Sequence, residues 1–218
     1  DALALLDKLF ETHNLVFVAG GSGLYIDALC TGIDDFPDPA PELRAFLKGI
    51  YQDEGLAILQ QMLLENDPEY YSMVDINNPN RLLRALEVCL TTGKKFSEQR
   101  LNNQKNRDFN IIKIALNLPR PQLFDRIERR VDQMIENGLV DEVKSLLPYR
   151  HLNALNTVGY KEIFQYLDSE ITLDQAVTNI KTNTRRYAKR QLTWFNRTDG
   201  YAWFEPTQLP AINDFISA

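Results

Sequence analysis

The chain has 218 residues, of which 44% are hydrophobic and 25% charged, as expected of a folded globular protein with a real core. It contains no apolar run near the roughly 18 residues that span a bilayer, and its first residues, DALALLDKLF, lack the basic start of a signal peptide, so the sequence predicts a cytoplasmic protein without a membrane segment. The two cysteines and two histidines stand at no metal-ligand spacing, which predicts free thiols and no structural metal site.

The formal net charge is -6, from 24 basic and 30 acidic residues, and it is unevenly distributed. Between Gln175 and Thr198 there is no acidic residue, whereas six basic residues occur there: Lys181, Arg185, Arg186, Lys189, Arg190 and Arg197. The rest of the chain therefore has 24 - 6 = 18 basic against 30 acidic residues, or -12. A positive segment on an acidic body predicts a directed contact with a polyanion.

The N-terminal segment has the order of an α/β unit. Residues 1–12 have an amphipathic helical pattern, Leu15–Val18 is a short apolar run that predicts a strand, and a second helical pattern follows Gly20-Gly21-Ser22-Gly23. A glycine loop at a helix N-terminus lets backbone N–H groups approach an anion. The phosphate loop G-x-x-x-x-G-K-[ST] needs a lysine that is absent here, so spacing alone favours a tight turn over an anion site.

A proline-rich linker at 36–41 leads into a region, about 40–106, that is predicted to be wholly helical. Pro41, Asp67-Pro68 and Asn78-Pro79 are helix starts, Asp53 is expected to cap the helix after the first, and Gly93 is expected to end the last. The inward stripe predicted for this last helix is Leu82, Leu83, Leu86 and Leu90.

In the C-terminal half, Phe109–Leu118 and Tyr201–Phe204 are predicted strands, which gives three in all with Leu15–Val18. Pro121 opens a long helix that ends near Gly138, with Leu123, Ile127, Val131, Met134 and Ile135 facing inward. Thr172-x-x-Gln175 resembles a capping box for a helix running to about Phe195. Its predicted inward stripe is Val177, Ile180, Tyr187 and Trp194, and a separate face holds Arg186, Lys189, Arg190, Thr193 and Arg197.

Three basic motifs each allow a functional and a structural interpretation. Arg81 and Arg84 share a helix face and could hold a phosphate backbone, or pair locally with Asp75 and Glu87. The segment Asp125–Arg130 supplies arginines for a diphosphate, or local ion pairs on a solvated face. The basic face near the C-terminus, interleaved with aromatic residues, fits nucleic-acid contact as well as a solvated helix with a packed core stripe.

The order of the motifs is more specific than any one of them. GGSGLY, RALEV, DRIERRVDQMIENGLVDEV, VGYKE and RRYAKRQLTWF together resemble the tRNA dimethylallyltransferase family along almost the entire chain. The resemblance implies an α/β, P-loop-kinase-like parallel core at residues 1–33 and 107–218, incomplete here, with an all-helical tRNA-binding insertion at 34–106.

The family's activity would be transfer of a dimethylallyl group from dimethylallyl diphosphate to N6 of the adenosine 3′ of the tRNA anticodon. The resemblance implies a Mg²⁺ ion and positive charge on the leaving diphosphate, a general base for the amine proton, and extrusion of the target base into a pocket. The implied partners are the tRNA anticodon arm and dimethylallyl diphosphate, and the expected state is a monomer.

Site residues carry over only where motifs match. Arg130 is expected to face the diphosphate, with Arg126 or Arg129 as alternatives. Ser22, where the family usually has threonine, keeps a hydroxyl for tRNA contact. The other implied tRNA contacts are Arg44, Asn80, Arg81, Leu82, Leu83, Arg84, Asn156, Thr157, Val158, Gly159, Tyr160, Lys161, Lys189, Arg190, Gln191, Leu192, Thr193, Trp194, Phe195 and Asn196. Asn196 replaces a usual basic residue, and Arg197 is a possible substitute.

The family's phosphate loop and catalytic aspartate are absent from this sequence. The resemblance places both upstream of Asp1, with most Mg²⁺ ligands, so we expect this polypeptide to be an N-terminally truncated form that binds tRNA weakly and catalyses nothing by itself. Two alternatives remain open: a tRNA-binding module without a catalytic role, and a fragment of a small-molecule nucleotide kinase. An upstream phosphate loop would favour the enzyme over the module, and steep loss of tRNA affinity with salt would exclude the kinase.

Overall fold

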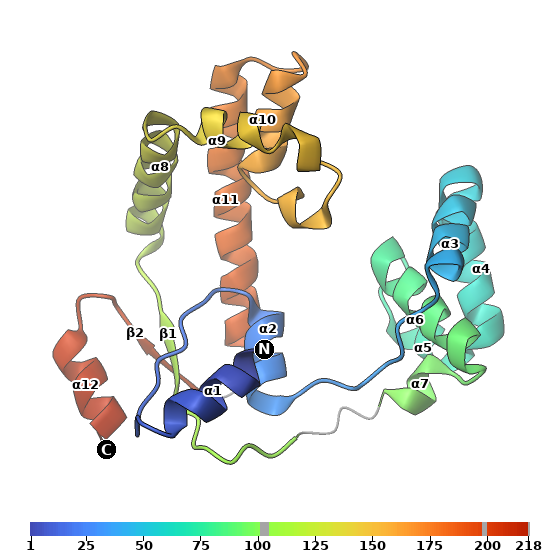
Figure 1. Ribbon diagram of the computed structural model, residues 1–218, viewed down its shortest axis with the longest axis horizontal. Coiled ribbons are helices and arrows are strands. Elements are labelled where there is room, and N and C mark those ends of the chain that lie inside the picture. Colours follow the sequence, from blue (N-terminus) through green and yellow to red (C-terminus); the bar gives the residue numbers. More distant parts are fainter. Residues whose placement is uncertain (101–104, 198–199, 218) are drawn as a thin grey trace. The chain divides into compact units, whose positions relative to one another are not determined.

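The protein is mostly helical with one small parallel sheet, as seen in a computed structural model (Figure 1). The structure describes residues 1–100, 105–197 and 200–217, so the part of the predicted insertion at 101–104 lies outside the described residues. Contacts divide the chain into two compact units, one formed by residues 1–16 and 24–108, the other by residues 17–23 and 109–218. The predicted domain boundaries at 33/34 and 106/107 remain a prediction.

The first unit contains helices only, among the residues described. They are α1 (Ala2–Phe10), α2 (Gly23–Thr31, whose first residue belongs to the other unit), α3 (Pro41–Glu54), α4 (Leu56–Asn66), α5 (Pro68–Met73), α6 (Pro79–Thr92) and α7 (Phe96–Gln99). Helix α4 packs against α3, α5 and α6. Their shared core is apolar and includes Leu47, Leu59, Leu63, Leu82, Leu86 and Phe96.

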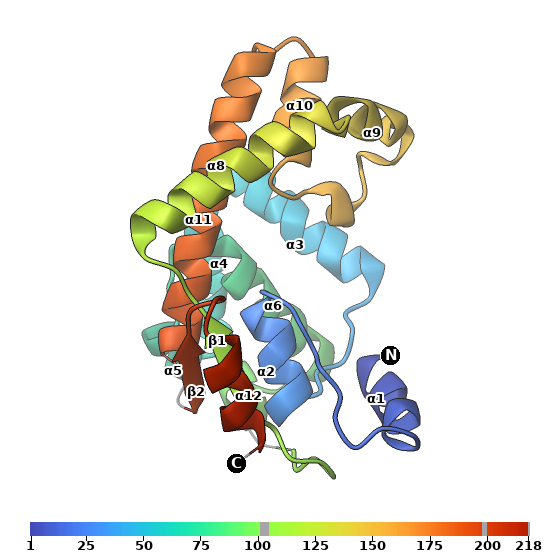
Figure 2. The ribbon, with the colours of Figure 1, turned by 90° about the vertical axis from the view of Figure 1, so that its left-hand side faces the viewer.

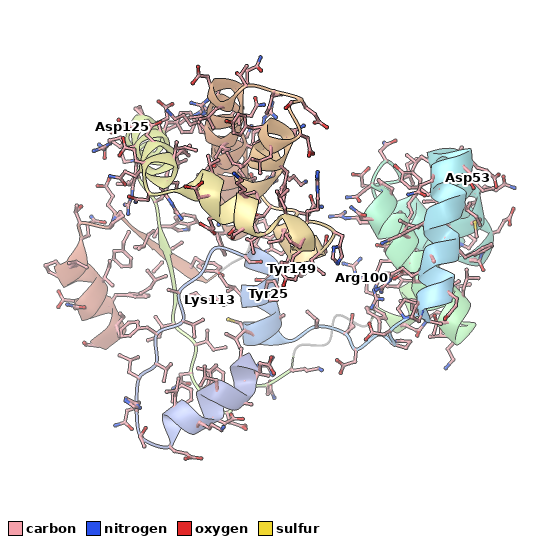
Figure 3. All side chains as sticks on the ribbon, turned by 45° about the horizontal axis from the view of Figure 1, so that its top comes forward. Tyr25, Asp53, Arg100, Lys113, Asp125 and Tyr149 are labelled. Carbon is pink, nitrogen blue, oxygen red and sulfur yellow. The ribbon has the colours of Figure 1, made fainter. Side chains whose placement is uncertain are left out.

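Most helix ends in this unit were predicted correctly because their signals are local. The side chain of Asn78 accepts the backbone N–H of Arg81 at the start of α6, and Gly93 ends that helix in the left-handed conformation, with φ of 67°. Asp53 was wrong as a cap, because α3 continues through it to Glu54 (Figure 3) and Gly55, with φ of 81°, makes the break. Leu90 was wrong as a core residue, since 41% of it is exposed.

Asp67 joins two helices of this core. It is fully buried, and Oδ1 accepts the backbone N–H of Tyr70 (2.9 Å) as the cap of α5. The same carboxylate accepts the backbone N–H of Ser97 (2.7 Å) and the Ser97 hydroxyl (2.8 Å) on α7. A buried carboxylate is tolerated because three donors face it.

The second unit builds a two-stranded sheet and a group of helices. Strand β1 (Lys113–Leu116) pairs in parallel with β2 (Tyr201–Phe204), with Lys113 opposite Tyr201 and Leu116 opposite Phe204. The helices are α8 (Arg120–Glu136), α9 (Leu139–Ser145), α10 (Tyr160–Leu167), α11 (Leu173–Asn196) and α12 (Leu209–Ser217), with short 3₁₀ turns at Leu147–Tyr149 and Asn153–Leu155. A parallel pair needs a long crossover between its strands, and α8 to α11 form that crossover here.

The predicted third strand at Leu15–Val18 was wrong. These residues form neither helix nor strand, and 75% of Phe17 and 60% of Val18 are exposed. A strand exists only through hydrogen bonds to a neighbour, and within the described part of the chain Leu15–Val18 has no such neighbour. Phe109–Leu118 was correct in kind but too long, because only its centre pairs with β2.

Helix α11 is held along its N-terminal half by α8 and α10, which pack against it (Figure 2). The core of this group is Val131, Leu139, Val143, Ile163, Phe164, Ala176 and Ile180. Two ion pairs link α8 to α11: Asp132 with Lys181 and Glu128 with Arg185, each at 2.6 Å. Tyr187 was wrong as a core residue, because 43% of it is exposed.

We expect the Asp67→Ala change to destabilise the first unit by about 2–4 kcal/mol, because it leaves the buried Tyr70 N–H and the half-buried N–H and hydroxyl of Ser97 without their acceptor. Urea unfolding followed by far-UV circular dichroism measures the loss. Asp75→Ala is the control, since Asp75 is exposed and accepts only the backbone N–H of Asn77 at 3.1 Å. Equal losses for the two variants would contradict the role given to Asp67.

Candidate functional site

The C-terminal half of α11 presents a cluster of positive charge to solvent. The capping box predicted at its start is present, since Thr172 Oγ1 accepts the Gln175 N–H and Gln175 Oε1 accepts the Thr172 N–H. Lys181 and Arg185 are paired with acids of α8. The other four cations of the segment are exposed and have no carboxylate partner among the described residues: Arg186, Lys189, Arg190 and Arg197.

Aromatic rings accompany two of these cations. The Arg197 guanidinium lies 3.8 Å from the centroid of the Trp194 ring, and that of Arg190 lies 5.6 Å from the Tyr187 ring. Stacked guanidinium groups keep their N–H edges available for phosphate oxygens. The predicted exposed face, which also includes Thr193, is confirmed as exposed; its contact with tRNA stays a prediction.

The glycine loop packs directly on this helix. Gln191 Nε2 donates to the carbonyl oxygen of Gly21 at 2.7 Å. A Cβ on Gly23 would lie 2.2 Å from Trp194 Cδ1, so that position has no room for a side chain. Ser22, half-buried between these two glycines, is thereby brought beside the segment 189–196, and its contact with tRNA stays a prediction. Leu192 and Phe195 of that segment are half-buried, and Asn196 is exposed.

The segment 156–161 forms a loop and the start of α10 in the same unit. Asn156, Thr157 and Lys161 are exposed, whereas Gly159 is buried, and Val158 is half-buried against the core. The Tyr160 hydroxyl donates a short hydrogen bond to Glu142, which raises the pKa of that hydroxyl above its ordinary value. Tyr160 is therefore engaged within the protein, and the exposed side chains are the ones available to a partner.

A cleft of about 940 Å³ opens at the carboxyl ends of β1 and β2. This is the end of a parallel sheet at which α/β proteins commonly bind ligands. Its lining combines cations with aromatic rings and includes Arg120, Arg185, Arg186, Lys189, Trp203 and Phe204. The cleft shares Arg186 and Lys189 with the exposed face of α11, so the two form one positive surface.

Arg130, expected to face the diphosphate, is exposed on α8 and does not line the cleft. Neither do Arg126 and Arg129, and Arg129 pairs with Asp125 one turn away (Figure 3 labels Asp125). Arg120, which sequence reasoning missed, does line it and lies 5.1 Å from the Phe124 ring centroid. The signal that could have indicated Arg120 is its position at the start of the helix that follows β1, near the carboxyl end of that strand.

The first unit holds a separate pair of arginines. Arg44 contacts Glu87 with two nitrogens, Nε to Oε1 at 2.9 Å and Nη2 to Oε2 at 3.4 Å, and this raises the pKa of Arg44. Arg84 Nη1 also donates to Glu87 (3.4 Å), which confirms the local pairing considered from sequence, and its guanidinium lies 5.9 Å from the Phe36 ring. Glu87, a buried acid, thus orients both arginines.

The remaining predicted contacts of this unit divide by exposure. Asn80 and Arg81 are exposed at the start of α6. Leu82 and Leu83 are buried in the helical core, so their side chains are occupied in packing and unavailable to RNA. No group of three or more His, Cys, Asp or Glu side chains that could hold a metal occurs in the described ranges, and no described helix is long and apolar enough to cross a membrane.

We expect Gly23→Ala to disturb the contact of the glycine loop with α11, because the new Cβ would overlap the Trp194 ring and either the ring or the loop must move. The expected cost is about 1–3 kcal/mol, with a change in tryptophan fluorescence. Gly20→Ala is the matched control, since nothing lies within 4 Å of a Cβ there. Indistinguishable spectra and stabilities for the two variants would show that the loop does not pack as described.

Comparison with known proteins gives a consistent result. The family described as IPP transferase matches residues 1–198. The chain is 48% identical over 216 residues to tRNA dimethylallyltransferase 1 of Bacteroides thetaiotaomicron, covering 99% of this chain and 70% of that protein. It is 47% identical to the protein of the same name from Bacteroides fragilis, over the whole chain and 72% of that protein.

Two solved structures are similar over nearly the whole chain. The tRNA isopentenylpyrophosphate transferase of Bacillus halodurans has a TM-score of 0.64 and 34% identity, over 99% of this chain and 70% of that one. A eukaryotic dimethylallyltransferase described as acting on tRNA has a TM-score of 0.71 and 26% identity, over 99% of this chain and 60% of that one. The motifs, the surface and these matches agree, and the chain belongs to the IPP transferase family.

Proposed function

We propose that this chain holds the anticodon arm of a tRNA for transfer of a dimethylallyl group to N6 of the adenosine 3′ of the anticodon. One observation carries the proposal: four exposed cations, three on the C-terminal half of α11 and Arg197 directly after it, have no carboxylate partner among the described residues and accompany a glycine loop that packs on Trp194. Unpaired cations on a helix face attract RNA phosphates by release of counterions. The names of the relatives, all tRNA-modifying prenyl transferases, supply the reaction.

In that reaction the N6 amine of adenosine forms a bond to the allylic carbon while the bond from this carbon to the diphosphate oxygen breaks. The diphosphate leaves with the electron pair, and the amine proton goes to a base. The sequence contains no G-x-x-x-x-G-K-[ST] loop, and we assign no general base to a described residue. The proposal therefore gives these residues the binding and orientation of the RNA.

The cleft at the carboxyl ends of β1 and β2 extends the RNA-binding surface. Arg186 and Lys189 lie on both, so an RNA phosphate on α11 would continue toward Arg120 and Trp203. A nucleotide of the bound RNA suits this cleft, because the lining offers cations for its phosphate and rings for its base. Arg130 remains our proposal for the diphosphate, with a Mg²⁺ ion neutralising that group when bound; within the described ranges no cluster of metal ligands supports the ion.

The first unit supplies a second set of RNA contacts in this proposal. Arg44 and Arg84 each keep N–H groups beyond those that Glu87 accepts, and their side chains are 46% and 38% exposed. Asn80 and Arg81 lie exposed one turn earlier on α6. We infer that residues 34–106 are a helical insertion for tRNA in a P-loop-kinase-like core, of which β1 and β2 are two parallel strands.

We expect Lys189→Ala combined with Arg190→Ala to weaken binding of an anticodon stem-loop RNA by this chain by about tenfold or more at roughly 0.1 M salt. The slope of log affinity against log salt should also fall by about one for each phosphate contact removed. Filter binding at a series of salt concentrations measures both quantities.

The control for charge alone is Lys144→Ala combined with Lys181→Ala. Lys144 is exposed on α9, and Lys181 is paired with Asp132, so the same charge is removed away from the proposed contact. This variant should keep its salt slope. A slope that falls equally in both double variants would mean that net charge, and not the face of α11, binds the RNA.

A further inference from the structure

A buried carboxylate lies behind the positive surface of the second unit. Glu162, on the first turn of α10, is only 4% exposed. Its Oε2 accepts the backbone N–H of Gly159 at 2.8 Å, and its Oε1 accepts Asn183 Nδ2 of α11 at 2.7 Å. Gly159 has φ of 100°, a conformation that favours glycine, so this carboxylate holds the turn that starts α10 and ties it to α11.

The network continues to the surface. Arg186 Nη1 donates to Asn183 Oδ1 at 3.3 Å, one turn along α11. A carboxylate can only accept hydrogen bonds, so Asn183 must turn its NH₂ group toward Glu162 and its carbonyl oxygen outward. The outward oxygen is the acceptor that Arg186 uses, and Arg186 lines the cleft. The direction of the Asn183 amide is therefore set from inside the protein.

We propose that Glu162 is a positioning residue for RNA binding, acting through Asn183 on Arg186, and that Arg186 contacts the RNA. The inference rests on the proposed function, because it gives Arg186 an RNA phosphate to bind. One carboxylate then fixes both the segment 156–161 and a cation of α11 relative to each other. An arginine already oriented loses less side-chain freedom when the RNA binds.

Capping of α10 alone would give Glu162 a purely structural role, and Glu162→Gln separates the two roles. The glutamine oxygen can accept from only one of the two donors. The Gly159 N–H is part of the backbone and cannot turn, whereas the Asn183 amide can rotate to offer its oxygen to the new NH₂ group. Rotation would turn Asn183 Nδ2 toward Arg186, where two donors repel. The variant keeps the cap and releases Arg186.

A double-mutant cycle with an anticodon stem-loop RNA and this chain tests the proposal. We expect Arg186→Ala to weaken binding about tenfold and Glu162→Gln about threefold to fivefold. The double variant should be no weaker than Arg186→Ala alone, because Glu162 acts through that arginine. The side-chain amide resonances of Asn183 should shift in Glu162→Gln, while the backbone amide resonance of Gly159 stays near its original position. Val143→Ala, which opens a cavity in the same core, is the control for lost stability and should keep its RNA affinity.

Three results would overturn the inference. Losses that multiply in the double variant would show that Glu162 and Arg186 act independently. A Glu162→Gln variant with unchanged affinity, or a Val143→Ala variant with the same loss of affinity, would reduce Glu162 to a structural residue. In each of these cases the unmodified chain still binds the RNA, so the proposed function stands. Failure of the unmodified chain to bind removes the proposed function, and the inference with it.

Discussion

Asp132 and Glu128 of α8 hold Lys181 and Arg185 of α11, and these contacts determine how the positive charge of α11 is distributed. Each pair is partly exposed, so solvent screening limits its contribution to stability to about 1 kcal/mol or less. These ion pairs matter more for the position of the unpaired positive charge than for the stability of the fold. Two of the six cations in the segment are neutralised where the helix is packed, and the other four lie toward its C-terminal end.

The rest of the protein is acidic, and this affects where a polyanion can bind. With 18 basic and 30 acidic residues outside the segment, most of the sequence disfavours a polyanion. An RNA is therefore repelled by the acidic parts of the chain and attracted by the cationic face of α11, which limits where it can bind. The glycine loop packs on the same helix, because Gly21 and Gly23 bring the loop backbone against Gln191 and Trp194. The shape of this surface is therefore fixed by packing as well as by charge.

Sequence reasoning succeeded where the signal lies within a few residues. The cap Asn78, the stop at Gly93 and the box Thr172–Gln175 each depend on the backbone beside them, and all are present. It failed where the answer depends on distant residues. Among the residues that the structure describes, Leu15–Val18 has strand composition but no hydrogen-bonded neighbour, and Leu90 has helical spacing but is 41% exposed. The order of motifs indicated the family, because order requires no three-dimensional information.

The candidate site shows the same division. The exposed face of α11 follows from helical periodicity, so its residues could be assigned from sequence. Arg120 reaches the cleft only because β1 pairs with β2, and Glu162 reaches Asn183 only because α10 packs on α11. Neither the pairing of β1 with β2 nor the packing of α10 on α11 can be predicted from the spacing of residues within these segments.

In each unit a buried glutamate orients arginine side chains that reach the surface, a feature that the counts of charged residues do not show. In the first unit, Glu87 is buried behind Arg44 and Arg84, and in the second, Glu162 is buried behind Asn183 and Arg186. A buried acid lowers the local positive charge and so weakens long-range attraction for RNA. It also fixes guanidinium groups that would otherwise lose rotamer freedom on binding. Lys189 and Arg190 have no acid behind them among the described residues. They therefore attract RNA more strongly at long range, but lose more side-chain freedom when it binds. Lys189 and Arg190 therefore contribute attraction, Arg44, Arg84 and Arg186 contribute orientation, and each of these two sets can be changed without the other.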